Sequence, residues 1–213
     1  MIGGLLVLTA PSGTGKTSVA RALVAGPDPY RFSVSATTRP ARGNEVNGRD
    51  YHFISDVEFD RLVAENQFLE WAHVHGNRYG TLVSEVDRIA AERSFAVLDI
   101  DVQGAIQVRE RAPDAILVFL LPPSGAVLVE RLAGRGTDQE AEVRARLSTA
   151  QSELEFAEHF DYCVVNMELA ETVDVVGRIV EAEGHRVGRL EDLGATIARL
   201  KTEIEEGAQA LAL

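Results

Sequence analysis

The sequence predicts an α/β protein of three layers, in which helices cover both faces of a central parallel sheet. Apolar runs with the length of buried strands alternate along the chain with helical patterns, which is typical of parallel βαβ units. The first apolar run leads into a glycine-rich loop and then a helix, the order expected of a phosphate-binding loop. A stretch of different composition, residues 36–82, interrupts the alternation and predicts an inserted lobe.

Strands of the central sheet are predicted where the chain is apolar throughout, because parallel sheets are buried on both faces. These runs are Leu5–Thr9, Phe95–Ile100, Ala115–Leu121 and Tyr162–Val165, and Phe32–Ser35 is predicted to be a further brief strand. A long helix is expected to end near Glu158, and the core is expected to comprise residues 1–35 and 83–185. In the lobe, Ser55 and Glu58 form a capping box before a helix, and Phe68–Val74 is predicted to be a strand.

The loop between the first strand and helix has the composition of a phosphate cradle. Its residues are Ala10, Pro11, Ser12, Gly13, Thr14, Gly15, Lys16 and Thr17. Glycines let backbone N–H groups approach an anion, Lys16 would reach the outer phosphates, and the Thr17 hydroxyl suits Mg²⁺. The alternative is an ordinary glycine turn, which the preceding strand and following helix make less favourable. Lys16 and Lys201 are the two lysines of the chain.

A second anion site is predicted in the lobe. Arg39 and Arg42 stand three residues apart and are followed by Tyr51 and Tyr79. Guanidinium forks and phenol hydroxyls are suited to a monophosphate. A solvated basic loop is the alternative, but the protein as a whole is acidic, with a net charge of −12.

Carboxylates at two further positions are candidate site residues. Glu70 lies in an apolar strand beside Trp71, where it could accept two hydrogen bonds from a guanine edge or simply face water at a sheet edge. Asp99 and Asp101 end the strand that starts at Phe95. They are candidates for holding hydrated Mg²⁺, and the alternative is that they cap the next helix.

Arginines gather around a glycine hinge at about residues 124–146, which predicts a mobile lid over the reaction. The four are Arg131, Arg135, Arg144 and Arg146. A helical surface laced with salt bridges is the alternative.

Composition limits the function classes. The net charge of −12 argues against nonspecific nucleic-acid binding, and no apolar run has the length of a membrane span. The N-terminus has no basic segment of the signal-peptide type. Cys163, the single cysteine, is expected to be a buried thiol in a reducing cytoplasm.

Taken in order, these motifs resemble the guanylate kinase family over about residues 4–185. The matching segments are residues 10–17, 33–40, 42, 45–51, 68–71, 76–81, 98–101, 103–104, 122–124, 134–137 and 165–166. The resemblance implies a P-loop three-layer α/β fold with a central parallel sheet, an inserted GMP-binding lobe and a mobile lid. It also implies phosphorylation of GMP, and of dGMP, by ATP with Mg²⁺, through direct in-line transfer.

The resemblance further implies roles for individual residues. Lys16, Arg42, Arg135 and Arg146 would be catalytic, Thr17 and Asp99 would serve the metal, and Asn166 would join residues 10–17 in binding ATP. The residues expected to bind GMP are Ser35, Arg39, Arg42, Glu45, Tyr51, Glu70, Tyr79, Thr81, Asp99 and Asp101. Two rivals remain from the sequence alone: a binding module without catalysis, and a kinase for another nucleoside monophosphate.

Residues 186–213 lie beyond the resemblance and predict a helix with one apolar stripe. Leu190, Leu193, Ile197, Leu200 and Ile204 recur at spacings of three and four. The stripe predicts either packing on the protein's own domain or a contact between two copies of the chain.

Overall fold

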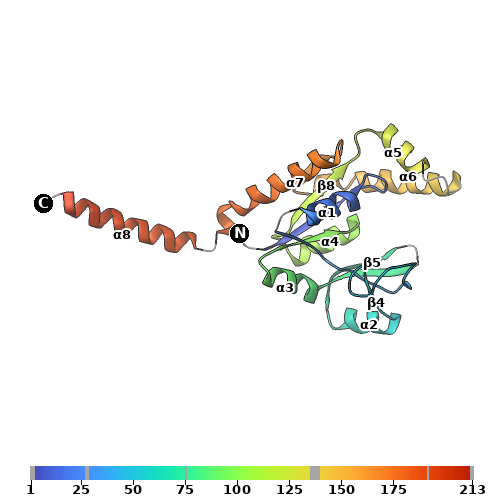
Figure 1. Cartoon of the computed structure of the whole chain (residues 1–213), viewed down its shortest axis with the longest axis horizontal. Coiled ribbons are helices and arrows are strands. Elements are labelled where there is room, and N and C mark those ends of the chain that lie inside the picture. The colour runs from blue at the N-terminus through green and yellow to red at the C-terminus, as the bar shows by residue number, and fades with distance from the viewer. Residues whose placement is uncertain (1–2, 27–28, 75, 135–139, 191, 212–213) are drawn as a thin grey trace. The chain divides into compact units, whose positions relative to one another are not determined.

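The structure of the protein is a computed structural model that describes residues 3–26, 29–74, 76–134, 140–190 and 192–211 (Figure 1). The chain divides into two compact units, Met1–Gly177 and Arg178–Leu213. The first unit holds every residue of the predicted nucleotide site.

The first unit contains a five-stranded sheet in the order β2-β7-β1-β8-β9, and all its neighbouring strands are parallel. The strands are β1 (Leu5–Thr9), β2 (Tyr30–Phe32), β7 (Phe95–Asp99), β8 (Ile116–Leu121) and β9 (Tyr162–Val165). β1 is central, and Leu6, Val7 and Leu8 have no exposed surface. The parallel α/β architecture predicted from the sequence is therefore confirmed.

The helices α1 (Lys16–Ala25), α3 (Val83–Ala91) and α4 (Val102–Arg111) contact strands of this sheet. The helices α5 (Gly125–Ala133) and α6 (Glu140–Leu154) contact each other, and α7 (Leu169–Gly184) follows β9 along the chain. Ile89 of α3 and Val108 of α4 share one buried cluster with Val7, Leu98 and Leu117 of the strands. Because strand side chains alternate between faces, Leu6 and Leu8 point to the opposite face from Val7.

Residues 36–82 hold a second sheet, with strand order β4-β3-β6-β5. Its elements are β3 (Ala36–Thr37), β4 (His52–Phe53), α2 (Asp56–Ala64), β5 (Phe68–Val74) and β6 (Asn77–Leu82). The Ser55 hydroxyl accepts the Glu58 N–H at 3.1 Å, as the capping box predicts. Phe59 of α2 stacks on Phe68 of β5 with ring centroids 4.4 Å apart, which gives this sheet a core of its own.

The strand predicted at Phe32–Ser35 is wrong in its position. β2 ends at Phe32, and the chain then crosses from the parallel sheet to the second sheet. The Ser33 N–H still bonds the Val97 carbonyl at 3.0 Å, whereas the Ser35 carbonyl already accepts the His52 N–H at 2.9 Å. The segment predicted as one strand therefore forms backbone hydrogen bonds with both sheets.

Two other expectations are corrected. α6 ends at Leu154 rather than near Glu158, and a short 3₁₀ turn, Ala157–His159, follows it. Cys163 is exposed, because β9 lies at the edge of the sheet and its alternate residue Val164 takes the buried position.

The second unit contains the end of α7, a 3₁₀ turn (Val187–Arg189) and α8 (Leu193–Leu211). Arg189 pairs with the buried Glu183 at 3.0 Å. Leu190 precedes α8, and the stripe residues Ile197, Leu200 and Ile204 are exposed. Across the described residues, no helix has the length and apolar character needed to cross a membrane.

Candidate active site

The glycine-rich loop joins the carboxyl end of β1 to the start of α1. Gly13 and Gly15 have φ angles of 87° and 102°, in the left-handed region that favours glycine. Gly15 caps α1 without a side-chain acceptor, so the first N–H groups of the helix are not satisfied by a cap. The loop therefore presents donors and the positive end of a helix dipole to an anion.

Asp99 connects the loop to the end of β7. The Lys16 ammonium lies 2.8 Å from Asp99 Oδ1 and donates to the Ile100 carbonyl at 2.6 Å. The Thr17 hydroxyl donates to Asp99 Oδ2 at 2.5 Å. The three predicted residues Lys16, Thr17 and Asp99 are thus brought together.

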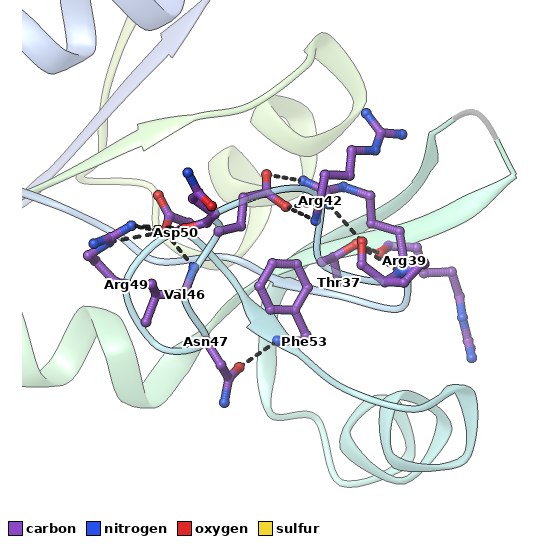
Figure 2. Close-up of polar contacts among 12 residues, drawn as sticks. Thr37, Arg39, Arg42, Val46, Asn47, Arg49, Asp50 and Phe53 are labelled. Carbon is purple, nitrogen blue, oxygen red and sulfur yellow. Dashed lines mark hydrogen bonds and ion pairs between the residues drawn. The ribbon is translucent and has the colours of Figure 1, made fainter.

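The arginine-rich loop is built around an ion pair between the buried Arg39 and the partly exposed Glu45 (Figure 2). Arg39 is 6% exposed and donates from two nitrogens to both Glu45 oxygens, each at 2.7 Å. Glu45 also accepts the Arg42 N–H at 2.8 Å, and these bonds, first that from Arg39, lower the pKa of Glu45 to about 2. The Arg39 guanidinium lies 4.9 Å from the ring centroid of Tyr51.

The side chains of Arg39 and Arg42 therefore differ in how they are held. Arg39 is fixed by its partners, and the Glu45 carboxylate raises its pKa further. The exposed guanidinium of Arg42 donates to no residue in the described part of the chain. Arg42 can therefore bind an incoming anion without first breaking a bond.

Glu70 lies in the interior of the protein and does not face water. Its side chain is 4% exposed, and its Oε1 accepts both the N–H of Thr81 at 2.9 Å and the Thr81 hydroxyl at 2.6 Å. A register irregularity between Phe68 and Glu70 breaks the alternation of β5, so the sequence pattern could not place this side chain. Burial raises the pKa of Glu70 to about 7, although the Thr81 hydroxyl opposes the shift.

One cavity of about 350 Å³ joins the loop to the second sheet. Its lining includes the predicted site residues Lys16, Thr17, Ser35, Tyr51, Glu70, Tyr79, Asp99 and Asp101. A neighbouring cavity of about 450 Å³ shares Thr17, Tyr51 and Asp99 and is also lined by Glu45. Asp101 has a second role that the sequence allowed, because it caps α4 by accepting the Gly104 N–H at 2.8 Å.

Side chains from later elements contact the glycine-rich loop. Arg146 of α6 donates to the Ser12 hydroxyl at 3.1 Å, and Asn166 donates to the Thr14 carbonyl at 2.7 Å. Arg135, which was predicted to be catalytic, lies outside the described residues.

Sequence reasoning missed two contacts with this loop. Glu153 of α6 accepts the Ser12 N–H at 3.3 Å, and burial raises the pKa of its carboxyl. Glu153 stands seven residues after Arg146 and so lies on the same helix face, a spacing that could have identified it. Arg131, recognised only as part of the lid cluster, donates to the Thr14 carbonyl at 3.0 Å.

Family, sequence and structure comparisons all match this chain to guanylate kinases. The family described as guanylate kinase matches residues 3–183. A guanylate kinase of Thermotoga maritima is 45% identical over 205 residues, which cover 96% of this chain and 98% of that protein. One from Neisseria meningitidis is 47% identical over 84% of this chain and 88% of that protein. The crystal structure of guanylate kinase from Anaplasma phagocytophilum has a TM-score of 0.73 and 33% identity, and covers 91% of this chain and 93% of that chain.

The buried carboxyl of Glu70 makes stability depend on pH. Its pKa is about 7 in the folded protein against an ordinary value of 4.5, so between these values the folded state holds a proton that the unfolded chain has released. The free energy of unfolding should therefore fall as the pH rises through this window. Glu70→Gln cannot ionise, and its side-chain oxygen can keep both bonds from Thr81.

Urea unfolding of wild type and Glu70→Gln from about pH 5.5 to about pH 8 measures this effect, and the wild type should lose about 2 kcal/mol relative to the variant. The exposed Glu110 provides a matched control, and Glu110→Gln should follow the wild type. Parallel stability curves for wild type and Glu70→Gln would show that Glu70 does not titrate in this range.

Proposed function

The chain belongs to the guanylate kinase family, and on this basis we propose that it transfers the γ-phosphoryl group of ATP to GMP, producing ADP and GDP. The observation that carries the proposal is the single cavity lined by Lys16 and Thr17 of the glycine-rich loop and by Glu70 of the second sheet. In this proposal the donor would bind at the loop end of that cavity and the acceptor at the end lined by Glu70. We extend the proposal to dGMP as a second acceptor.

On the acceptor side, the GMP phosphate would bind Arg39, Arg42, Ser35 and the two tyrosines. The support is chemical: Arg39 is held in place by Glu45, Arg42 is exposed, and Tyr51 and Tyr79 pack edge to face with centroids 5.9 Å apart. The guanine would be read by Glu70, whose Oε1 is bonded to Thr81 and whose Oε2 can accept from the base.

On the donor side, the loop N–H groups and Lys16 would bind the ATP phosphates, with Asn166 close to the nucleotide. Lys16 would leave Asp99 and Ile100 and move onto the phosphate oxygens, since its ammonium is a flexible point charge. Arg146, with Arg135 from the lid, would add positive charge at the transferring group. An oxygen of the GMP phosphate then attacks the γ-phosphorus in line, and closure of the lobe and lid excludes water.

We propose Mg²⁺ as the accompanying ion. The Thr17 and Asp99 oxygens lie 2.5 Å apart beside the loop, and no group of three His, Cys, Asp or Glu side chains in the described ranges could hold a metal. This donor set fits an ion whose other ligands are phosphate oxygens and water, as Mg²⁺ prefers. Bound with ATP, Mg²⁺ supplies neutralisation of charge on the phosphates.

The domain division is also a proposal. It assigns residues 1–35 and 83–185 to the ATP-binding core with a lid at about 124–146, residues 36–82 to the GMP-binding lobe, and residues 186–213 to a helical tail. The strand orders of the two sheets support the first boundary. We further propose a cytoplasmic location, where both nucleotides are available and a free Cys163 stays reduced.

An acceptor panel tests the function directly. A coupled assay for ADP with GMP, dGMP, AMP or UMP as acceptor should show turnover of GMP and dGMP. AMP and UMP should have kcat/KM values lower by about 10⁴-fold, because adenine and uracil leave the buried Glu70 carboxylate without its matching donors. ATP without an acceptor is the control for hydrolysis. Equal use of AMP and GMP would contradict the proposal.

Lys16 is the proposed cation of the donor site, and Lys16→Met should lower kcat by about 10²-fold or more while the fold is retained. Lys201→Met is the matched control, because Lys201 is the other lysine of the chain and lies in α8. Circular dichroism and thermal melting check the fold of both variants. Wild-type turnover by Lys16→Met would exclude a catalytic role for Lys16.

We propose that α8 pairs with α8 of a second copy of the chain. Leu193, Ile197, Leu200 and Ile204 follow coiled-coil spacing, and the last three are 44–68% exposed. Leu200→Glu should convert a dimer into a monomer in light scattering and leave kcat unchanged. Ala198→Glu, one residue away from the stripe, is the control and should remain dimeric. A monomeric wild type at high concentration would contradict the pairing.

A further inference from the structure

Two side chains hold the orientation of the peptide group between Thr14 and Gly15 in the glycine-rich loop. The Thr14 carbonyl accepts from Asn166 Nδ2 at 2.7 Å and from Arg131 Nη1 at 3.0 Å. In a trans peptide the carbonyl and the following N–H point in opposite directions. Holding the Thr14 carbonyl toward Asn166 therefore turns the Gly15 N–H away from Asn166.

Gly15 is closely packed against the same amide. A Cβ atom at Gly15 would lie 2.8 Å from Asn166 Nδ2, and the φ angle of 102° excludes other residues as well. The side chain of Asn166 thus packs against the Gly15 backbone and, together with Arg131, orients the peptide group that carries the Gly15 N–H.

Thr172, in the first turns of α7, binds the other end of the Asn166 amide. Its hydroxyl donates to Asn166 Oδ1 at 2.9 Å, and the two residues are 2% and 6% exposed. Because Nδ2 must face the Thr14 carbonyl, Oδ1 must face Thr172, and a flipped amide would place two acceptors against each other. The Thr172 hydroxyl also lies 2.9 Å from the Glu168 carbonyl, which accepts the Thr172 N–H at 3.0 Å as well. The Glu168 carbonyl thus keeps a donor when the hydroxyl proton is directed to Asn166 Oδ1.

We propose that Thr172 is a positioning residue of the ATP site, which acts through Asn166 to aim the Gly15 N–H at the donor phosphates. The inference rests on the proposed function, since it takes the loop to be the site of ATP. It assigns Asn166 a role in holding the loop in addition to any contact with the nucleotide. Without the hydroxyl, the buried Oδ1 loses its donor and the amide is no longer held in one orientation.

Thr172→Val removes the hydroxyl and keeps the shape of the side chain. It should weaken ATP binding about fivefold to tenfold, measured by calorimetry, and raise KM for ATP to the same extent, with KM for GMP unchanged. Thr172→Ser restores the hydroxyl and should recover most of the affinity. Thr202→Val is the matched control, because the Thr202 hydroxyl bonds a carbonyl four residues back in α8, far along the chain from the loop.

A double-mutant cycle with Asn166→Ala tests the route of the effect. If Thr172 acts through Asn166, adding Thr172→Val to Asn166→Ala causes no further loss of ATP affinity. A lower melting temperature with unchanged ATP affinity, equal weakening of ATP and GMP, failure of the serine variant, or additive losses would each overturn the proposal. GMP turnover by the wild type tests the proposed function separately, because it does not depend on any Thr172 variant.

Discussion

The parallel pairing of β1 with β7 is the constraint on which the site depends. Its register sets Leu8 opposite Asp99, so both strands end at the same edge of the sheet. The glycine-rich loop begins where β1 ends, and the Asp99 carboxylate lies beside Lys16 and Thr17 because of that register. A shift of one residue would turn Asp99 to the other face of the sheet and leave the ammonium without its partner.

The protein handles its buried charges in two different ways. The buried Arg39 keeps its charge because the partly exposed Glu45 accepts two bonds from it and compensates the guanidinium. Glu70 has no cation among its bonded partners, so burial instead raises its pKa to about 7. The first arrangement holds the Arg39 guanidinium in one position. The second keeps a carboxylate in reserve for a ligand that brings its own donors.

Features that depend on local pattern were predictable, and features that depend on tertiary contacts were not. Apolar runs and glycine spacing identify β1, β8 and the loop, since burial on both faces and positive φ angles leave a direct mark on the sequence. Neighbouring structure decides the exposure of Cys163, which follows from the edge position of β9, and the burial of Glu70, which follows from a register irregularity in β5. Asn166 contacts the loop at Thr14, 152 residues earlier in the chain, and Thr172 reaches the loop only through Asn166, so no local sequence pattern predicts this arrangement.

The exposed position of Cys163 has a practical consequence for experiments on this protein. It is the single cysteine of the chain and lies on β9, at the edge of the parallel sheet. A fluorophore or spin label attached through a thiol would therefore go to one known position without prior removal of other cysteines. Partial burial raises the pKa of the thiol, so labelling proceeds faster at mildly alkaline pH. A second label in residues 36–82 would then report how far the second sheet moves from the first when nucleotides bind.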